Sequence, residues 1–296
     1  MARLTIPAIE LMSSGHSACP GCGAPLVMRY LLKGLGPNTI VTVPACCWTV
    51  IATPFPTTAL DVPMLDNAFE ATGASISGLR AAADMLGLKD VTIVGFAGDG
   101  GTVDIGLQAL SGMLERRTDG IYVMYDNEAY MNTGVQRSGA TPEGAWTTTT
   151  PVDAVSRGKA EQKKDIMAIV AAHRPAYAAT VNVAFPEDFV KKVEKARSIH
   201  GPRFIHALAP CPPGWRYSSE KTIEIGRLAT DTNVFPLYEI EDGKYRITRK
   251  LGKAKPVAEY LKAQGRFGHL NEAEIAEIQA QVDANWKRLV TLETLP

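Results

Sequence analysis

The sequence predicts an α/β protein with a doubly wound, mostly parallel sheet and a small irregular C-terminal extension. Two observations predict this fold class. Continuous apolar runs of strand length, such as VTIVGFA (91–97) and IYVMYD (121–126), are typical of buried parallel strands. These runs alternate with helix-like segments along most of the chain, and such alternation indicates an open sheet covered by helices on both faces.

The individual elements follow in a regular order. Residues 24–36 predict a helix that Gly36-Pro37 ends, and small residues over 68–87 predict a closely packed helix that ends at Gly87. The remaining expected elements are a strand at 39–44, a strand at 91–97, a Gly-rich turn at 98–102, an amphipathic helix at 103–117, a strand at 121–126, a helix at 164–174, a strand at 177–183, a helix at 186–200 and a strand at 203–210.

The character of the chain changes after residue 212. The following segment is rich in turns, with a hairpin expected around 241–243. A final helix is expected to begin at Asn271, a capping residue that Glu274 follows three positions later. We therefore expect an α/β domain over 1–212 and an extension over 213–296, packed on the same unit or on partner subunits.

Composition and charge exclude several classes of function. The 31 basic and 31 acidic residues cancel, which gives no electrostatic case for nucleic acid as a partner. No apolar run reaches the roughly 18 residues of a transmembrane helix, so no membrane is expected. The N-terminal segment lacks the apolar core of a signal peptide, and we expect a cytoplasmic protein. Five cysteines in that compartment point to metal or redox work rather than disulfides.

The Gly-rich turn at 98–102 contains a carboxylate where an anion-binding loop would otherwise be expected. Gly98 and Gly100 let a phosphate approach the backbone, but Asp99 would repel it unless a cation lay between them. Mg²⁺ or Ca²⁺ would satisfy both groups, because these ions prefer oxygen ligands. Asn127, at the end of the next buried strand, offers a second oxygen ligand. The alternative is a plain tight turn with Asn127 as a cap.

A Cys-x-x-Cys pair, Cys19 and Cys22, raises the question of what these thiols hold. The other cysteines are Cys46, Cys47 and Cys211. Four thiolates from separated positions suit either an iron–sulfur cluster or a structural zinc ion, and the spacing alone does not separate the two.

Longer motifs resemble a known family. Gly98-Asp99-Gly100, followed after 26 residues by Asn127, resembles the thiamine diphosphate motif. More narrowly, the chain resembles the β subunit of pyruvate:ferredoxin oxidoreductase, also called pyruvate synthase. The resemblance is carried by the runs GHSACPGCG, YDNEAYMNTGVQRSGATPEGAWTTTTP and PCPPGW, and it extends from about residue 13 to about residue 270.

The resemblance implies roles for named residues. It implies a thiamine diphosphate-binding fold over 1–212 that also carries the cluster cysteines. The 4Fe-4S ligands would be Cys19, Cys22, Cys47 and Cys211, with Cys46 left as a small buried thiol. The Mg²⁺ ligands would be Asp99, Asn127 and the carbonyl of Ala129. The diphosphate would contact Gly98, Gly100 and Thr102, and Asn132 would face the aminopyrimidine and the reacting carbon as a catalytic residue. His16 and the other histidines are given no function.

The resemblance also implies an activity and partners. The chain would act with α, γ and δ subunits in the oxidative decarboxylation of pyruvate, with coenzyme A accepting the acyl group and ferredoxin the electrons. Two alternatives stay open. One is the same chemistry on another 2-oxoacid, such as 2-oxoisovalerate or oxalate. The other is a non-catalytic subunit built around zinc.

Overall fold

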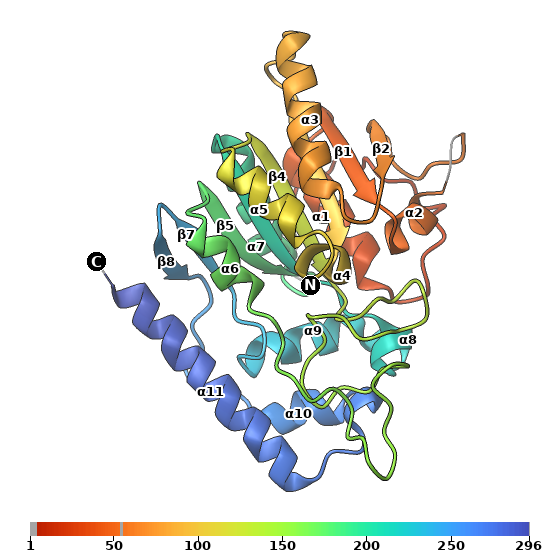
Figure 1. Cartoon of the computed structure of the whole chain (residues 1–296), viewed down its shortest axis with the longest axis vertical. Coiled ribbons are helices and arrows are strands. Elements are labelled where there is room, and N and C mark those ends of the chain that lie inside the picture. Colours follow the sequence, from red (N-terminus) through yellow and green to blue (C-terminus); the bar gives the residue numbers. More distant parts are fainter. Residues whose placement is uncertain (1–4, 54–55, 296) are drawn as a thin grey trace.

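An eight-stranded sheet forms the centre of the molecule (Figure 1). The computed structural model describes residues 5–53 and 56–295. Residues 1–4, which begin the segment examined for a signal peptide, and residues 54–55 lie outside the described residues. The strand order is β2-β1-β3-β4-β6-β5-β7-β8, and β7 alone runs in the direction opposite to the other strands of the sheet. The strands are β1 (Thr39–Pro44), β2 (Met64–Asn67), β3 (Thr92–Gly98), β4 (Gly120–Asp126), β5 (Tyr177–Asn182), β6 (Pro202–Leu208), β7 (Tyr238–Glu241) and β8 (Lys244–Ile247).

Helices cover both faces of this sheet, as the alternating pattern predicted. One face packs against α1 and α7, and the other against α3, α5 and α6 (Figure 1). The helices are α1 (Gly23–Leu35), α2 (Cys47–Ala52), α3 (Thr72–Met85), α4 (Asp99–Val103), α5 (Leu107–Glu115), α6 (Ile166–Ala172), α7 (Pro186–Ser198), α8 (Pro212–Trp215), α9 (Thr222–Asp231), α10 (Val257–Lys262) and α11 (Glu272–Thr294), with short 3-10 turns η1 (Ser219–Lys221) and η2 (Gly265–Phe267).

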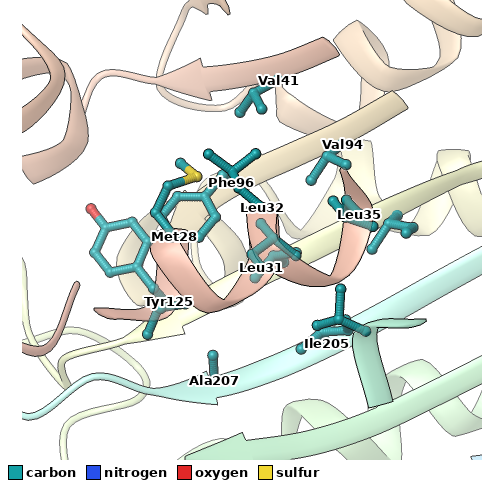
Figure 2. Close-up of a cluster of buried hydrophobic side chains, with 14 of the residues drawn as sticks. Met28, Leu31, Leu32, Leu35, Val41, Val94, Phe96, Tyr125, Ile205 and Ala207 are labelled. Atoms are coloured by element: carbon teal, nitrogen blue, oxygen red, sulfur yellow. The ribbon is translucent and has the colours of Figure 1, made fainter. Parts of the chain in front are cut away.

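The apolar face of α1 shows how the sheet is covered. Figure 2 shows four side chains of this helix facing strand residues from β1, β3, β4 and β6. The strand residues alternate, so that Val94 and Phe96 of β3 point to the same face. Full burial of each such leucine or methionine stabilises the fold by roughly 1.5–3 kcal/mol. The helix residues are Met28, Leu31, Leu32 and Leu35.

One expected helix is divided in two. The sequence predicts a turn at 98–102 and a single helix at 103–117, whereas residues 99–103 form α4 and the next helix begins at Leu107. A side chain at position 106 could not be accommodated, because its Cβ would lie 2.0 Å from the carbonyl oxygen of Gly101. Asp104 interrupts the helix between them with φ −112° and ψ −99°. The predictions of a turn at 98–102 and of one continuous helix at 103–117 are therefore wrong, and Asp99 lies at the first position of a helical turn.

The C-terminal segment adds to the same sheet. The expected hairpin is confirmed as β7 and β8, and β7 pairs with β5. The expected cap of the final helix is also confirmed, because the Asn271 side chain accepts from the Glu274 amide while Glu274 accepts from the Asn271 amide. A separate apolar cluster, including Trp215, ties the extension to the edge of the sheet. The division at residue 212 stays a prediction.

Within residues 5–53 and 56–295, no helix is both long enough and apolar enough to cross a membrane.

Candidate functional site

Four neighbouring strands deliver predicted site residues to one edge of the sheet. The order β1-β3-β4-β6 places the carboxyl ends of these parallel strands side by side. The residues that follow them are Cys47 after β1, Asp99 after β3, Asn127 after β4 and Cys211 after β6. Open α/β sheets bind ligands at this edge, beside the point where the strand order reverses.

The Cys-x-x-Cys loop is fixed to this edge from outside the sheet. Cys22 precedes the first residue of α1, and the Gly23 amide donates to the carbonyl of Pro210 at 3.0 Å. Gly21 has φ +72°, and a Cβ there would lie 2.3 Å from the Ser219 carbonyl oxygen. Thr222 Oγ1 donates to the Gly21 carbonyl at 2.5 Å. The loop therefore requires glycine and is held beside the turn that carries Cys211.

The charges of neighbouring thiols affect the pKa values of Cys22, Cys47 and Cys211 at this edge of the sheet. Burial raises the pKa of Cys22 to about 12, and the charges of Cys211 and Cys19 add to the effect. Burial also raises the pKa of Cys47 to about 12 and that of Cys211 to about 11, with other members of the group as further causes. A buried thiolate is unstable without a nearby positive charge. Thiols of this kind are thus held in the neutral form until a cation reaches them.

The cysteines form neither a compact single-ion site nor disulfide bonds among the described residues. Within the described ranges, no three His, Cys, Asp or Glu side chains lie close enough together to hold one metal ion. All five cysteines are free of disulfide bonds.

Cys46 lies in a different environment from Cys47. Burial raises the pKa of Cys46, and hydrogen bonds to its sulfur from Tyr125, Trp48 and Thr49 act in the opposite direction. The Cys46 sulfur is therefore hydrogen-bonded near Tyr125, whereas the pKa of Cys47 is raised, after burial, by the charges of Cys46, Cys211 and Cys22.

Three buried oxygens meet beside the thiols. Asn127 presents its side-chain oxygen to Asp99 Oδ1 at 2.9 Å and to the Ala129 carbonyl oxygen at 3.0 Å. These residues are 5 %, 1 % and 4 % exposed, respectively. Three acceptors this close repel one another unless the amide turns its NH₂ toward them or a cation lies among them. The Asn127 Nδ2 atom lies 3.9 Å from Cys47 Sγ, so one side chain reaches both groups.

The carboxylate of Asp99 is held from its other side. Its Oδ2 atom accepts a hydrogen bond from the buried hydroxyl of Ser138. Burial and the negative charge of Asp126 raise the pKa of Asp99 well above its usual range. A cation at this position would reverse the cost of burying the charge.

The glycines and Thr102 line the start of α4. A Cβ at Gly100 would lie 2.2 Å from Cε1 of Tyr130, so the ring requires glycine there. Gly98 approaches Tyr125, to whose hydroxyl a Cβ would lie 3.2 Å away. The Thr102 hydroxyl donates to the Gly98 carbonyl at 2.7 Å. It is therefore engaged with the backbone, and contact between Thr102 and a diphosphate stays a prediction.

Asn132 lies apart from the buried oxygens. It is exposed, in a turn closed by backbone hydrogen bonds between Tyr130 and Gln136. Its assignment as a catalytic residue stays a prediction.

Four contributors to the site were missed in the sequence. Trp215 Nε1 donates to the carbonyl of Asn127 at 2.8 Å. Glu128 accepts from Lys163 and Arg266 at 2.7 and 2.5 Å. The runs PCPPGW and EYLKAQGRFGHL contain Trp215 and Arg266, but no local pattern indicates what these side chains touch.

The fold and this edge of the sheet define a class of protein. Residues 47–207 match the family described as "Thiamine pyrophosphate enzyme, C-terminal TPP binding domain". A solved structure, 2-oxoglutarate:ferredoxin oxidoreductase from Magnetococcus marinus, is 18 % identical with a TM-score of 0.59, covering 75 % of this chain and 82 % of that one. This likeness shows the same fold. The chain is thus a thiamine diphosphate-type α/β protein.

Curated relatives identify the family within that class. Ketoisovalerate oxidoreductase subunit VorB of Pyrococcus furiosus is 52 % identical over 98 % of this chain and 96 % of its own length. Pyruvate synthase subunit PorB of Methanocaldococcus jannaschii is 50 % identical over 98 % of this chain and 99 % of its own. The chain belongs to the PorB and VorB family of 2-oxoacid:ferredoxin oxidoreductase subunits.

Proposed function

We propose that this chain is the β subunit that binds Mg²⁺–thiamine diphosphate and a 4Fe-4S cluster side by side in a coenzyme A-dependent 2-oxoacid:ferredoxin oxidoreductase. The observation that carries the proposal is the meeting of two donor sets at one edge of the sheet. Three oxygens of Asp99, Asn127 and Ala129 converge there, next to thiols that act on one another.

The spacing of the three oxygens fits magnesium. Mg²⁺ binds oxygen octahedrally at about 2.0–2.1 Å, so adjacent ligand oxygens lie about 2.9 Å apart. The Asn127 side-chain atom that faces Asp99 Oδ1 and the Ala129 carbonyl oxygen lies 2.9 and 3.0 Å from them, which is this spacing; with the amide turned, the same two distances are hydrogen bonds from its NH₂ group. Asp99 supplies the negative charge, and Ser138 fixes its orientation. Gly98 and Gly100, which pack against Tyr125 and Tyr130, would contact the diphosphate through their backbone.

The thiol set fits a cluster of iron and sulfide. Cys19, Cys22, Cys47 and Cys211 come from three separate loops and influence one another electrostatically. Iron would stabilise the thiolates, whose protons leave on binding. When bound, thiamine diphosphate supplies the electron sink for decarboxylation and the cluster the electron acceptor. Asn127 would lie between the two groups, because its amide is 2.9 Å from Asp99 Oδ1 and 3.9 Å from Cys47 Sγ.

The proposal includes partners. Coenzyme A takes the acyl group, and ferredoxin accepts the electrons through clusters on another subunit, since this chain has only one cysteine beyond the four proposed ligands. The α, γ and δ subunits complete the complex. The alternative, a non-catalytic zinc subunit, predicts a colourless protein with zinc. Metal analysis after anaerobic purification therefore separates the two, because our proposal requires brown protein with iron and sulfide.

Pyruvate is the proposed substrate, on the strength of the run YDNEAYMNTGVQRSGATP. The second candidate is 2-oxoisovalerate, because the VorB relatives named for ketoisovalerate are as similar to this chain as the PorB relatives. A substrate panel on the assembled complex, with coenzyme A and a viologen dye, decides between them. Since a few methyl groups change kcat/KM by roughly 10–200-fold in a fitted pocket, the preference will be measurable. A higher kcat/KM for 2-oxoisovalerate than for pyruvate contradicts the first assignment.

The metal assignment gives a direct prediction. Asp99→Asn removes one anionic donor from Mg²⁺ and is expected to weaken thiamine diphosphate binding at least tenfold, about 1.4 kcal/mol. Calorimetry on the assembled complex measures the change, and the iron content should stay that of the wild type. Asp165→Asn is the matched control, because Asp165 caps α6 and is not one of the three proposed magnesium ligands. Equal affinities for the Asp99→Asn variant and the wild type would show that the turn does not carry the metal.

A further inference from the structure

Glu128 occupies an unusual position in the proposed cofactor loop. It lies between Asn127, whose side chain faces Asp99, and Ala129, whose carbonyl oxygen faces the Asn127 side chain. Its backbone has φ +67°, in the left-handed region that non-glycine residues seldom adopt. Its side chain is 3 % exposed and points away from the oxygens, into a pair of cations. Such a conformation costs about 1–3 kcal/mol and persists only where surrounding contacts impose it.

The contacts that impose it come from two distant segments. Arg266 Nη2 donates to Glu128 Oε2 at 2.5 Å, and Lys163 Nζ donates to Oε1 at 2.7 Å. The Thr141 hydroxyl donates to the Glu128 carbonyl at 2.7 Å. Lys163 also contacts Asp126, at the end of β4. The Glu128 carboxylate is thus held from both sides, and only Arg266 belongs to the C-terminal extension.

Arg266 also reaches the loop by a second route. Its guanidinium lies over the Trp215 ring, 4.1 Å from the centroid, and Trp215 Nε1 donates to the Asn127 carbonyl at 2.8 Å. Arg266 is 1 % exposed, and its Nε donates to Gln264. Fully buried ion pairs add little net stability, because desolvation offsets the attraction. Stability alone therefore does not account for this pair, whereas a role in fixing the loop does.

We propose that Arg266 is a positioning residue for the magnesium–diphosphate site. Through Glu128 and Trp215 it holds the loop in the conformation that places the Asn127 side chain against Asp99 and against the Ala129 carbonyl. The C-terminal extension thereby sets the affinity of the α/β domain for its cofactor. This inference rests on the proposed function and adds to it a residue outside the cofactor-binding motif.

The test compares cofactor affinity in variants of the assembled complex. Arg266→Met keeps most of the side-chain volume but removes the charge and the fork of donors. We expect its affinity for thiamine diphosphate, titrated calorimetrically with Mg²⁺ present, to fall about 10–100-fold, the usual effect of losing a residue that orients metal ligands. Arg266→Lys restores a cation and should recover part of the affinity. Iron content should be unchanged in both variants.

Two comparisons separate positioning from general stability. Arg157→Met breaks a different contact with the extension, the exposed ion pair between Arg157 and Glu274, and should leave cofactor affinity unchanged. In the double variant Glu128→Gln/Arg266→Met, the loss should be smaller than the sum of the single losses, because the two residues act as one unit. An Arg266→Met complex with a lowered Tm but wild-type cofactor affinity would overturn the inference.

The outcome is readable even if one variant does not fold. Glu128→Gln keeps the shape of the side chain, so it decides the matter if Arg266→Met gives no folded complex. Weakening by about tenfold supports the inference, and wild-type affinity overturns it. Failure of the proposed function looks different: wild-type complex would then bind thiamine diphosphate without need of Mg²⁺, or not at all.

Discussion

Replacement of Cys211 by alanine is expected to remove the iron–sulfur cluster from this chain. Cys211 follows β6 on a turn bounded by Pro210 and Pro212, and the charge of Cys19 contributes to the raised pKa of the Cys211 thiol. A 4Fe-4S cluster uses four thiolates, so the remaining three cannot complete the set. Iron analysis of the purified chain should show a near-complete loss, together with the absorbance at about 400 nm that such clusters show.

Cys46→Ala is the matched control for that experiment. Cys46 is the nearest alternative to Cys47 in the sequence, but its sulfur is hydrogen-bonded to Tyr125, and its charge acts on its neighbour Cys47. The variant should keep both iron and colour. If Cys46→Ala bleaches the protein while Cys47→Ala does not, the assignment of the third ligand is off by one residue.

The second large effect is expected without any mutation: the isolated chain should not turn over. Its family match is to a C-terminal thiamine pyrophosphate-binding domain. The resemblance to the β subunit of pyruvate:ferredoxin oxidoreductase implies that the glutamate that activates the aminopyrimidine would be supplied by the α subunit. The chain alone would hold the diphosphate without that group. Catalytic groups that act as a unit fail together when one is missing, so partial activity is not expected.

An activity assay with purified subunits tests this directly. The chain is purified with its cluster, then mixed with thiamine diphosphate, Mg²⁺, pyruvate, coenzyme A and viologen. No dye reduction is expected until the α chain is added. Exposed apolar side chains at the end of α3, Met85 and Leu86, also suggest that the chain alone will tend to associate. Dye reduction by this chain alone, at a rate near that of the complex, contradicts the account.

Much of the fold could be predicted because its strands carry a strong local signal. Both faces of β3 and β4 are covered, so their sequences are continuous apolar runs that resemble no other element. The strand β2, with partly exposed residues at the edge of the sheet, gave no such signal and was missed. The break between α4 and α5 was missed because it depends on contact of Gly106 with Gly101, which no periodicity reports.

Part of the candidate site could be predicted from the sequence, and part could not. Asp99 and Asn127 could be placed together, because adjacent parallel strands end at the same edge and both residues follow such strands. The contact between Arg266 and Glu128 joins positions 138 residues apart. A single sequence contains no signal for such a pair, since arginine and glutamate are common on surfaces and only burial makes them unusual.

Our central proposal is that the cysteines of this chain would hold a cluster that accepts the electrons of the 2-oxoacid first. To test it, the assembled complex is loaded with Mg²⁺ and thiamine diphosphate and mixed anaerobically with pyruvate or 2-oxoisovalerate. Coenzyme A and ferredoxin are left out, and the absorbance at about 400 nm is followed. The account predicts a loss of absorbance that requires thiamine diphosphate and that Cys211→Ala abolishes. Equal bleaching in the Cys211→Ala complex, or none in an iron-loaded wild-type complex, would contradict it.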